Sequence, residues 1–369
     1  MTFPSDRAGA VLTIDLGAIA RNYRTLRDRL DGAGCAAVVK ADAYGLGVER
    51  VAPVLARAGC TVFFVATLDE GIALRRILGE ASIMALDGAF AGCEAEFAEH
   101  DLVPVLNDLG QIARWQALAR ERNVRLDAVV HIDTGMNRLG LPACEVDVLA
   151  EAPERLDGLR LALVMSHLAC AEDRAQPMNA RQRDAFAALR TRLPAAPASL
   201  ANSSGIFLGS DYHFDLARPG VALYGVNPTP DAPNPMAEVV RLQGKILQVR
   251  DVDSPQTVGY GAAHRVAAPG RIATVPVGYA DGYHRALGNR AFAAIGDVRV
   301  PVVGRVSMDL ITLDVTGVPP GHALPGAAVD LIGGACPVEE VAAWADTIGY
   351  EILTSLGRRY ARRYVGGTA

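Results

Sequence analysis

A single lysine stands at the end of a short apolar run near the N-terminus. Residues 36–39 (Ala-Ala-Val-Val) have the composition of a buried strand, and Lys40 follows them directly. Taking an ammonium group out of water lowers its pKa, and such an amine can form a Schiff base or act as a general base. The alternative is a strand-end lysine that extends into solvent. Tyr44, and a Gly-Leu-Gly turn at residues 45–47 before a helix that begins near Val48, favour the chemical interpretation.

The segment AVVKADAYGLG (residues 37–47) closely resembles the part of alanine racemases in which a lysine carries pyridoxal 5'-phosphate. The resemblance implies that Lys40 holds this cofactor and also serves as a catalytic base. It further implies that Tyr44 contacts the cofactor phosphate. Other motifs of the same family follow in order along essentially the whole chain.

The segment HIDTGMNRLG (residues 131–140) resembles a second family motif, DTGM-x-RLG. The resemblance implies that Arg138 holds the substrate carboxylate, a task that suits a planar guanidinium able to bind a carboxylate at two points. His131 departs from the family, because many members carry a lysine there, often carbamylated, whose negative charge supports the arginine. A metal site formed by His131 and Asp133 is conceivable, but no third ligand is evident, and we expect no metal.

Two glycine-containing segments late in the alternating region have the composition of a phosphate-binding site. They are residues 202–205 (Asn-Ser-Ser-Gly) and residues 218–221 (Arg-Pro-Gly-Val). In a barrel of parallel strands and helices, phosphate commonly binds after strands seven and eight, at a short helix N-terminus. Ordinary turns are the alternative interpretation. Both segments resemble the phosphate loops of alanine racemases, which implies that Asn202, Ser203, Gly220 and Val221 bind the cofactor.

Arg218 faces the pyridine nitrogen of the cofactor according to the same resemblance. An arginine stays protonated, so it donates a hydrogen bond without transferring a proton. The nitrogen then stays unprotonated, and the cofactor becomes a weaker electron sink, which favours clean reprotonation over transamination. His167, at the end of an apolar run, resembles the cofactor-site histidine that links this arginine to a catalytic tyrosine.

The remaining family motifs lie in the C-terminal third. The loop TVGYG (residues 257–261) resembles the one whose tyrosine acts on L-alanine from the other subunit, so Tyr260 is the expected second base. Because the unperturbed pKa of tyrosine is about 10, Tyr260 needs neighbours to work near neutrality. The motifs GYADG (278–282) and GRVSMD (304–309) imply that Tyr279 lines the entrance and that the Met308 N–H binds the substrate carboxylate. Arg358 replaces a phosphate-side tyrosine of some members, so no phosphate contact is expected there.

These residues must be positioned by a regular alternation of apolar runs and helical patterns. Strand candidates lie at residues 36–41, 62–66, 82–86, 102–106, 127–133, 160–168, 198–204 and 213–218, and helical patterns at 68–78, 90–100, 108–122, 143–152 and 180–193. Eight such units predict an α/β chain with an N-terminal (β/α)8 TIM-type barrel. A doubly wound sheet is the rival, but no GxGxxG follows a strand. Asp15 is placed to cap a helix over residues 16–30.

The proline-rich stretch NPTPDAPNP (residues 227–235) marks the predicted domain boundary. Beyond it, short β-rich runs at 239–252, 271–277, 298–303, 310–315 and 328–332 indicate a mostly antiparallel β domain, with a closing helix at about 338–348. We therefore predict a cofactor-binding barrel over residues 15–230 and a β domain over 236–369. The N-terminal strand 10–14 is expected to join the β domain.

Composition excludes several classes of protein. The chain has 36 basic and 41 acidic residues and a net charge of −5, so nucleic-acid binding is not expected. Its six cysteines form no CxxC pair or zinc-like pattern, which is typical of a reducing compartment. Residues 1–10 show no apolar core of a signal peptide, and no run of 18 apolar residues occurs, so we expect a cytoplasmic protein without membrane contact.

The expected function is interconversion of L-alanine and D-alanine, either to supply D-alanine for peptidoglycan or for alanine catabolism, in a homodimer with shared active sites. Two bases are expected because a proton removed from one face of a planar carbanion must return on the other. An amino-acid decarboxylase on the same architecture is one rival, disfavoured by the arginine at the ring nitrogen. A cofactor carrier is another, disfavoured by Tyr260, since a carrier needs no second base.

Overall fold

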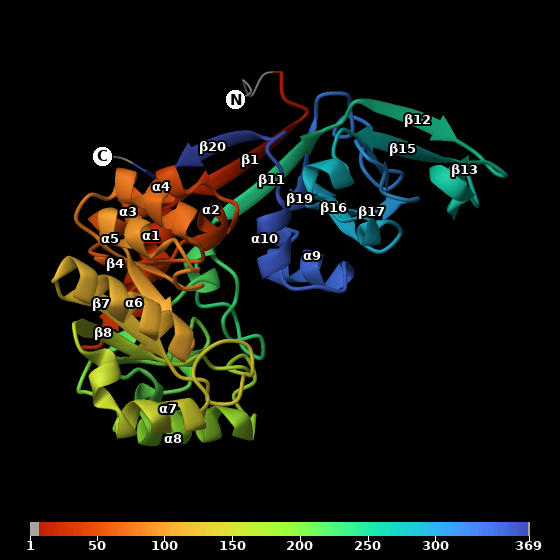
Figure 1. Cartoon of the computed structure of the whole chain (residues 1–369). Coiled ribbons are helices and arrows are strands. Elements are labelled where there is room, and N and C mark those ends of the chain that lie inside the picture. The colour runs from red at the N-terminus through yellow and green to blue at the C-terminus, as the bar shows by residue number, and fades with distance from the viewer. Residues whose placement is uncertain (1–6, 368–369) are drawn as a thin grey trace. The chain divides into compact units, whose positions relative to one another are not determined.

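Seven parallel strands form one sheet in sequence order in the computed structural model, which describes residues 7–367 (Figure 1). They are β3 (Ala37–Val38), β4 (Val62–Val65), β5 (Ser82–Ala85), β6 (Val103–Leu106), β7 (Leu126–His131), β8 (Leu159–Met165) and β9 (Ala198–Ser199). The next strand, β10 (Leu216–Ala217), pairs in parallel with β2 (Gly34–Cys35), which precedes β3 by one residue. Hydrogen bonds from Asp215 N to Ala198 O and from Arg218 N to Ala201 O, both 2.9 Å, join β10 to β9. The ring of strands is thereby closed, and the predicted (β/α)8 barrel is confirmed.

Helices lie between the barrel strands along the chain. They are α1 (Leu16–Arg27), α3 (Val48–Arg57), α4 (Leu68–Ile77), α5 (Glu94–Glu99), α6 (Leu109–Arg122), α7 (Ala143–Glu151) and α8 (Pro177–Arg190). Side-chain caps explain where several of them begin. Asp15 Oδ1 accepts the N–H of Ala18 (2.8 Å), as expected from the sequence, and Asp108 Oδ1 accepts that of Gln111 (2.8 Å). Such caps satisfy N–H groups that have no partner inside the helix.

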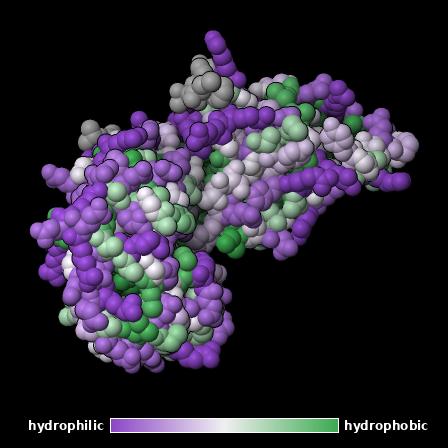
Figure 2. All heavy atoms as spheres, in the orientation of Figure 1, coloured by the Kyte–Doolittle hydropathy of each residue, from purple (hydrophilic) through white to green (hydrophobic). Residues whose placement is uncertain are grey.

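The barrel strands are apolar along most of their length, because parallel strands of this kind are covered on both faces. Every residue of β6 is buried, as are the last three residues of β4 and of β5. The helices present their polar sides outward, and Figure 2 shows hydrophilic side chains over much of the visible face of the barrel. The carboxyl ends of the strands are consequently the places where polar side chains enter the barrel.

A nine-stranded, mostly antiparallel sheet forms the second part of the chain. Its order is β12 (Gln248–Val252), β15 (Gly270–Val275), β18 (Ile311–Asp314), β17 (Val298–Val303), β16 (Phe292–Ile295), β19 (Ala328–Ile332), β11 (Val240–Lys245), β1 (Ala10–Asp15) and β20 (Ala361–Val365). A short hairpin of β13 (Thr257–Val258) and β14 (His264–Arg265) and the helices α9 (Val338–Trp344) and α10 (Gly349–Ser355) accompany it. The predicted mostly antiparallel β domain is confirmed.

Contacts divide the chain into two compact units. The barrel unit comprises residues 19–43 and 47–237, and the β unit comprises 7–18, 44–46 and 238–367. The N-terminal strand β1 pairs antiparallel with β11 and parallel with β20. The first six residues of the N-terminal segment and residues 368 and 369, with which the predicted β domain ends, lie outside the described residues. Within the described range no helix is long and apolar enough to cross a membrane.

Several elements of the β unit differ from the sequence-based prediction. Strands β13, β14, β16 and β20 were not predicted, and the single run predicted at 239–252 is two strands, β11 and β12. The single closing helix predicted at about 338–348 is two helices, α9 and α10. Strand β20 carries Arg362 and Arg363. It pairs only with β1 at the edge of the sheet, and edge strands tolerate charged side chains.

Candidate active site

Lys40 lies two residues after β3, at the carboxyl end of the first barrel strand. Its side chain is partly buried. Burial and then the positive charge of Arg138 lower the pKa of Lys40, while the negative charges of Asp87 and Glu70 act in the opposite direction. A larger share of the amine is therefore neutral near physiological pH, which is the form that attacks a carbonyl or accepts a proton.

The turn after Lys40 has an unusual backbone. Ala41, Asp42, Ala43 and Tyr44 all have φ between 54° and 56°, in the left-handed region. The sequence predicts a turn that depends on Gly45 and Gly47, but the turn begins with four residues that have side chains. Each such residue costs roughly 1–2 kcal/mol in this conformation. The turn then leads into α3 at Val48, where the sequence predicted a helix start.

Two carboxylates stabilise this turn. Asp42 Oδ1 accepts the N–H of Val48 (2.7 Å). Glu70 Oε1 accepts the N–H of Ala41 (2.7 Å), and Glu70 Oε2 accepts the N–H of Ala66 (2.8 Å). Glu70 was missed in the sequence analysis. The available signal was Thr67 three residues earlier, because Thr-x-x-Glu is the pattern of a helix capping box.

Arg218 is held at its place by three barrel residues. It is 4% exposed, and its Nη1 donates to Ser199 Oγ while its Nη2 donates to Ser166 O (2.6 Å). Nη2 also lies 3.3 Å from Nδ1 of His167. Burial lowers the pKa of Arg218 to about 10, so the guanidinium is still protonated at neutral pH.

The contact with Arg218 fixes the protonation of His167. A guanidinium only donates hydrogen bonds, so Nδ1 of His167 must accept, and the ring proton must be on Nε2. Burial, and after it the charge of Arg218, hold the pKa of His167 well below its ordinary value. His167 is therefore a neutral ring that can donate a hydrogen bond through Nε2.

His131 ends β7 and has a partner that the sequence analysis did not identify. Its Nδ1 lies 2.8 Å from Oδ1 of Asn107, the residue that follows β6. Burial, followed by the charge of Arg218, lowers the pKa of His131 to about 4. The ring is neutral at physiological pH. The only signal for Asn107 was its position at the carboxyl end of a buried strand.

Arg138 follows a turn organised by Asp133. Oδ1 of Asp133 accepts the N–H groups of Gly135 (2.9 Å) and Met136 (2.9 Å), so this carboxylate shapes the loop. The Arg138 side chain is exposed and makes no hydrogen bond or ion pair with another residue in the range 7–367. Its positive charge nevertheless helps to lower the pKa of Lys40, of His131 and of His167.

Hydrogen bonds join the two predicted phosphate-binding segments, residues 202–205 and 218–221. Ser203 Oγ accepts the N–H groups of Gly220 (3.0 Å) and Ala222 (3.3 Å). Both hydrogen bonds use the oxygen as acceptor, so the hydroxyl proton of Ser203 is still available. Asn202 Oδ1 accepts the N–H of Gly205 (2.9 Å) at the start of the 3-10 helix η2 (Gly205–Phe207).

Further donors lie beside this contact. The Ser204 hydroxyl is buried and has no hydrogen-bond partner among the described residues. Val221 is the first residue of the 3-10 helix η4 (Val221–Tyr224), so its N–H has no acceptor within that helix. The arrangement offers several donors to one anion and goes beyond an ordinary turn.

The other predicted site residues belong to the β unit. Tyr260 begins the 3-10 helix η5 (Tyr260–Ala262), between Gly259 and Gly261, both with positive φ, and its side chain is 73% exposed. Tyr279 and Met308 are also exposed. The turns that carry them pack together, since Tyr279 N donates to Ser307 O (3.0 Å).

Tyr44 is buried in the β unit, with its ring centroid 6.1 Å from that of Tyr350. The Met308 N–H has no acceptor in the part of the chain that the structure describes. It is therefore free to bind another group.

Several charged residues of the barrel act on the same histidine, His167. Besides burial, the charges that lower the pKa of His167 are those of Arg218, Arg138, His131 and Lys40. Lys40, His131, His167 and Arg218 all stand at the carboxyl ends of barrel strands, where the active sites of such barrels lie. Three permanent or potential cations around two neutral imidazoles make a site suited to anionic ligands.

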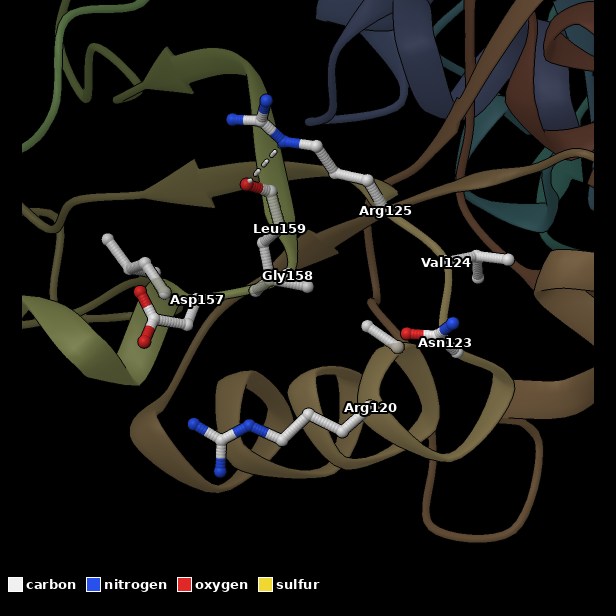
Figure 3. A pocket seen from close by; sticks show the side chains of 9 residues that line it. Arg120, Asn123, Val124, Arg125, Asp157, Gly158 and Leu159 are labelled. Atoms are coloured by element: carbon white, nitrogen blue, oxygen red, sulfur yellow. Dashed lines mark hydrogen bonds between the residues drawn. The ribbon is translucent and has the colours of Figure 1, made fainter.

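A separate cavity lies at the opposite ends of the strands. Figure 3 shows this shallow cavity of about 400 Å³, whose lining includes Arg120, Asn123 and Asp157. It adjoins the amino ends of β7 and β8, where Arg125 Nε donates to Leu159 O (3.3 Å). No predicted site residue lines it, and we assign no catalytic role to it. Within residues 7–367 no group of three or more His, Cys, Asp and Glu side chains could hold a metal ion.

Sequence comparison identifies relatives over the whole chain. The family model of the alanine racemase N-terminal domain matches residues 14–228, and that of the C-terminal domain matches residues 239–364. The alanine racemase of Rhodospirillum rubrum is 53% identical over 363 residues, covering 98% of this chain and 97% of that protein. The catabolic alanine racemase of Mesorhizobium japonicum is 50% identical over 361 residues, covering 98% and 94%.

Solved structures agree with the sequence relatives. Alanine racemase from Bartonella henselae, with covalently bound pyridoxal phosphate, is 41% identical and superposes with a TM-score of 0.94, covering 97% of this chain and 100% of that one. The biosynthetic alanine racemase from Pseudomonas aeruginosa is 33% identical, with a TM-score of 0.90 and coverages of 97% and 99%. Both domains match in order, at high identity and over nearly the full length, and the chain therefore belongs to the alanine racemase family.

Proposed function

We propose that this chain binds pyridoxal 5'-phosphate and interconverts L-alanine and D-alanine. The observation that carries the proposal is Arg218, a buried guanidinium held by Ser166 and His167 at the carboxyl end of the barrel. When bound, the cofactor supplies a conjugated ring that takes up negative charge from the alanine α-carbon. Arg218 would donate a hydrogen bond to the ring nitrogen without transferring a proton, which would keep that charge uptake moderate.

The residues present fit such a cofactor. Lys40 supplies a partly buried amine with a lowered pKa, as covalent attachment to an aldehyde requires. The hydroxyl groups of Ser203 and Ser204 and the N–H of Val221 supply donors for a phosphate. The N–H of Gly220 joins the two loops through Ser203 Oγ, and Asn202 caps the start of η2 within its own loop. Asn202, Gly220 and Tyr44 are proposed to bind the same phosphate.

Substrate binding requires a group that holds a carboxylate. We assign this role to Arg138, whose guanidinium makes no hydrogen bond with the described residues and can therefore bind both carboxylate oxygens. The free N–H of Met308 is the second proposed contact. Holding the carboxylate at two points fixes which face of the α-carbon each base reaches.

Two residues move the proton. Lys40 Nζ, neutral in part because of its lowered pKa, takes or returns the α-proton on one face. Tyr260 Oη serves the opposite face, since one fixed base cannot easily reach both. Its exposed position in this chain is what a tyrosine supplied to a partner subunit would show, and we propose a homodimer with shared sites.

His167 is proposed to support Tyr260 as the second base. Its Nε2–H, fixed by the contact between Nδ1 and Arg218, can donate to a tyrosinate oxygen and stabilise that charged form. A neutral imidazole suits this role because it donates a hydrogen bond without transferring its proton. Arg218 and His167 would thus connect the cofactor ring to the second base.

Following optical rotation tests the proposal. Purified protein is mixed with pyridoxal 5'-phosphate and L-alanine, and a racemase brings the rotation to zero while total alanine stays constant. A decarboxylase would release carbon dioxide, and a carrier would leave L-alanine unchanged. Either result contradicts the proposal. We further propose a cytoplasmic location, with the product serving peptidoglycan synthesis or alanine catabolism.

A further inference from the structure

The side chain of Asn107 is held in a single orientation. It is 5% exposed, and its Nδ2 donates to Leu86 O (3.0 Å) and to Val105 O (2.9 Å). Both amide protons are used on carbonyl oxygens, which only accept, so the amide cannot be turned over without losing both hydrogen bonds. Its backbone N–H donates to Gln111 Oε1 (2.9 Å), which fixes the residue further. Oδ1 must therefore be the atom that faces His131.

This orientation determines the tautomer of His131. Oδ1 of Asn107 is an acceptor at 2.8 Å from Nδ1, so Nδ1 must carry the ring proton. The ring is buried and neutral, so Nε2 carries a lone pair. His131 and His167 consequently have opposite tautomers, one accepting at Nε2 and the other donating there.

The loop that carries Arg138 folds back onto His131. Leu141 N donates to His131 O (2.8 Å), and Asp133 N donates to Leu141 O (2.9 Å), so residues 133–141 form a closed loop against the end of β7. A Cβ on Gly140 would lie 3.1 Å from Cδ2 of the His131 ring, which shows how closely the loop approaches. Arg138 stands two residues before Gly140 and has no acceptor among the residues described here. The loop that carries the guanidinium of Arg138 thus packs against the edge of the His131 ring that includes Nε2, since Cδ2 is bonded to Nε2.

We propose that Asn107 is a positioning residue that locks His131 as the Nδ1–H tautomer, so that Nε2 stays available as an acceptor that orients Arg138 when its guanidinium binds the substrate carboxylate. This inference rests on the proposed function for its kinetic consequence only. The tautomer itself follows from hydrogen bonds within the barrel unit.

The tautomer is measured directly. Nitrogen NMR of protein labelled in its histidine rings distinguishes a protonated from an unprotonated ring nitrogen, and the His131 signals are assigned by their loss in His131→Gln. In wild-type protein, Nδ1 of His131 should be protonated and Nε2 unprotonated. Asn107→Ala should mix or invert the two, whereas Asn179→Ala, which also removes a buried asparagine of the barrel unit, should leave them unchanged. A protonated Nε2 in the wild type would overturn the inference, whether or not the protein racemises alanine.

The kinetic consequence separates positioning from folding. Asn107→Ala should raise KM for alanine about tenfold, the scale of a weakened hydrogen bond to a charged group, while cofactor affinity stays unchanged. Asn179→Ala should change neither. An Asn107→Ala enzyme with normal KM would overturn the proposal.

A second pair of variants covers the case in which Asn107→Ala does not fold. His131→Gln places an amide oxygen near the position of Nε2 and should keep KM within about threefold, whereas the shorter His131→Asn should not reach Arg138 and should raise KM about tenfold. Equal KM values for these two variants would contradict the proposal.

Discussion

Glu70 Oε1 accepts the N–H of Ala41 at 2.7 Å, and Ala41 is the residue directly after Lys40. The same carboxylate accepts the N–H of Ala66 after β4, so it joins the first two strand ends of the barrel. It also raises the pKa of Lys40, opposing the larger effect of burial. One side chain thus supports a left-handed turn and influences the proposed base.

Replacing Glu70 should therefore change both stability and Lys40 reactivity. Glu70→Ala is expected to lower the free energy of unfolding by about 1–3 kcal/mol, the scale of hydrogen bonds to a charged acceptor. Loss of its negative charge should also lower the pKa of Lys40 further. Chemical denaturation measures the first effect, and the pH dependence of amine acylation at Lys40 in cofactor-free protein measures the second. Asp69→Ala is the matched control, because it removes the preceding carboxylate of the same helix and should leave Lys40 unaffected. A similar shift in both variants would disprove the specific role of Glu70.

Lys40 should be the residue that carries the cofactor. Borohydride reduction of the loaded protein fixes the cofactor to its lysine, and peptide mapping should find the label in the segment around residue 40. Lys245 is the only other lysine of the chain and acts as an internal control. A label on Lys245 would refute the assignment of the whole site.

The sequence indicated the proposed chemical groups of the site more readily than the residues that support them. Lys40, Arg138 and Arg218 were proposed because each stands in a short motif that resembles one of the family. Asn107 and Glu70 act on residues 24 and 29 positions away, across neighbouring strands. Such pairs depend on which strand ends meet, and no local pattern specifies that.

The fold was predictable to a similar extent. Long apolar runs separated by helical patterns indicated the barrel, since a parallel strand buried on both faces is recognisable alone. Strand β20 was missed because its sequence, Ala-Arg-Arg-Tyr-Val, has no buried alternation strong enough to outweigh two arginines. Both arginines make hydrogen bonds within the β unit. Arg362 Nη1 donates to Gly45 O (2.6 Å), and Arg363 Nη2 donates to Thr13 Oγ1 (3.0 Å).

Acid should destabilise the protein partly through His131. Its pKa is about 4 in the folded chain and about 6.5 when unfolded, so between these values the unfolded state binds more protons. The free energy of unfolding should therefore fall as pH decreases from about 6.5 to 4, by up to about 1.4 kcal/mol per pH unit from this residue. His131→Gln removes this contribution. Urea unfolding at several pH values should give a shallower slope for the variant, and parallel slopes would show that His131 does not resist protonation.

Activity should not depend on carbon dioxide. The resemblance to the family predicted a lysine, often carbamylated, at the position of His131, and a histidine cannot form that stable carbamate. Adding bicarbonate should leave the wild-type rate unchanged, whereas His131→Lys should be active and should respond to bicarbonate. His131→Ala should weaken alanine binding by about 1–3 kcal/mol. If the wild-type rate rose several-fold with bicarbonate, some other group would have to support Arg138.

Mixing two inactive variants should restore activity if active sites are shared between subunits. Lys40→Ala removes one proposed base and Tyr260→Phe removes the other, and each variant alone should racemise alanine very slowly. In a mixed dimer with shared sites, one site combines Lys40 of one subunit with Tyr260 of the other, and the second site has neither. Random exchange of equal amounts should then give about a quarter of the wild-type activity. Lys40→Ala mixed with the double variant Lys40→Ala/Tyr260→Phe is the matched control and should stay inactive. If activity does not recover although the subunits are shown to exchange, each chain builds its site alone and Tyr260 serves its own barrel.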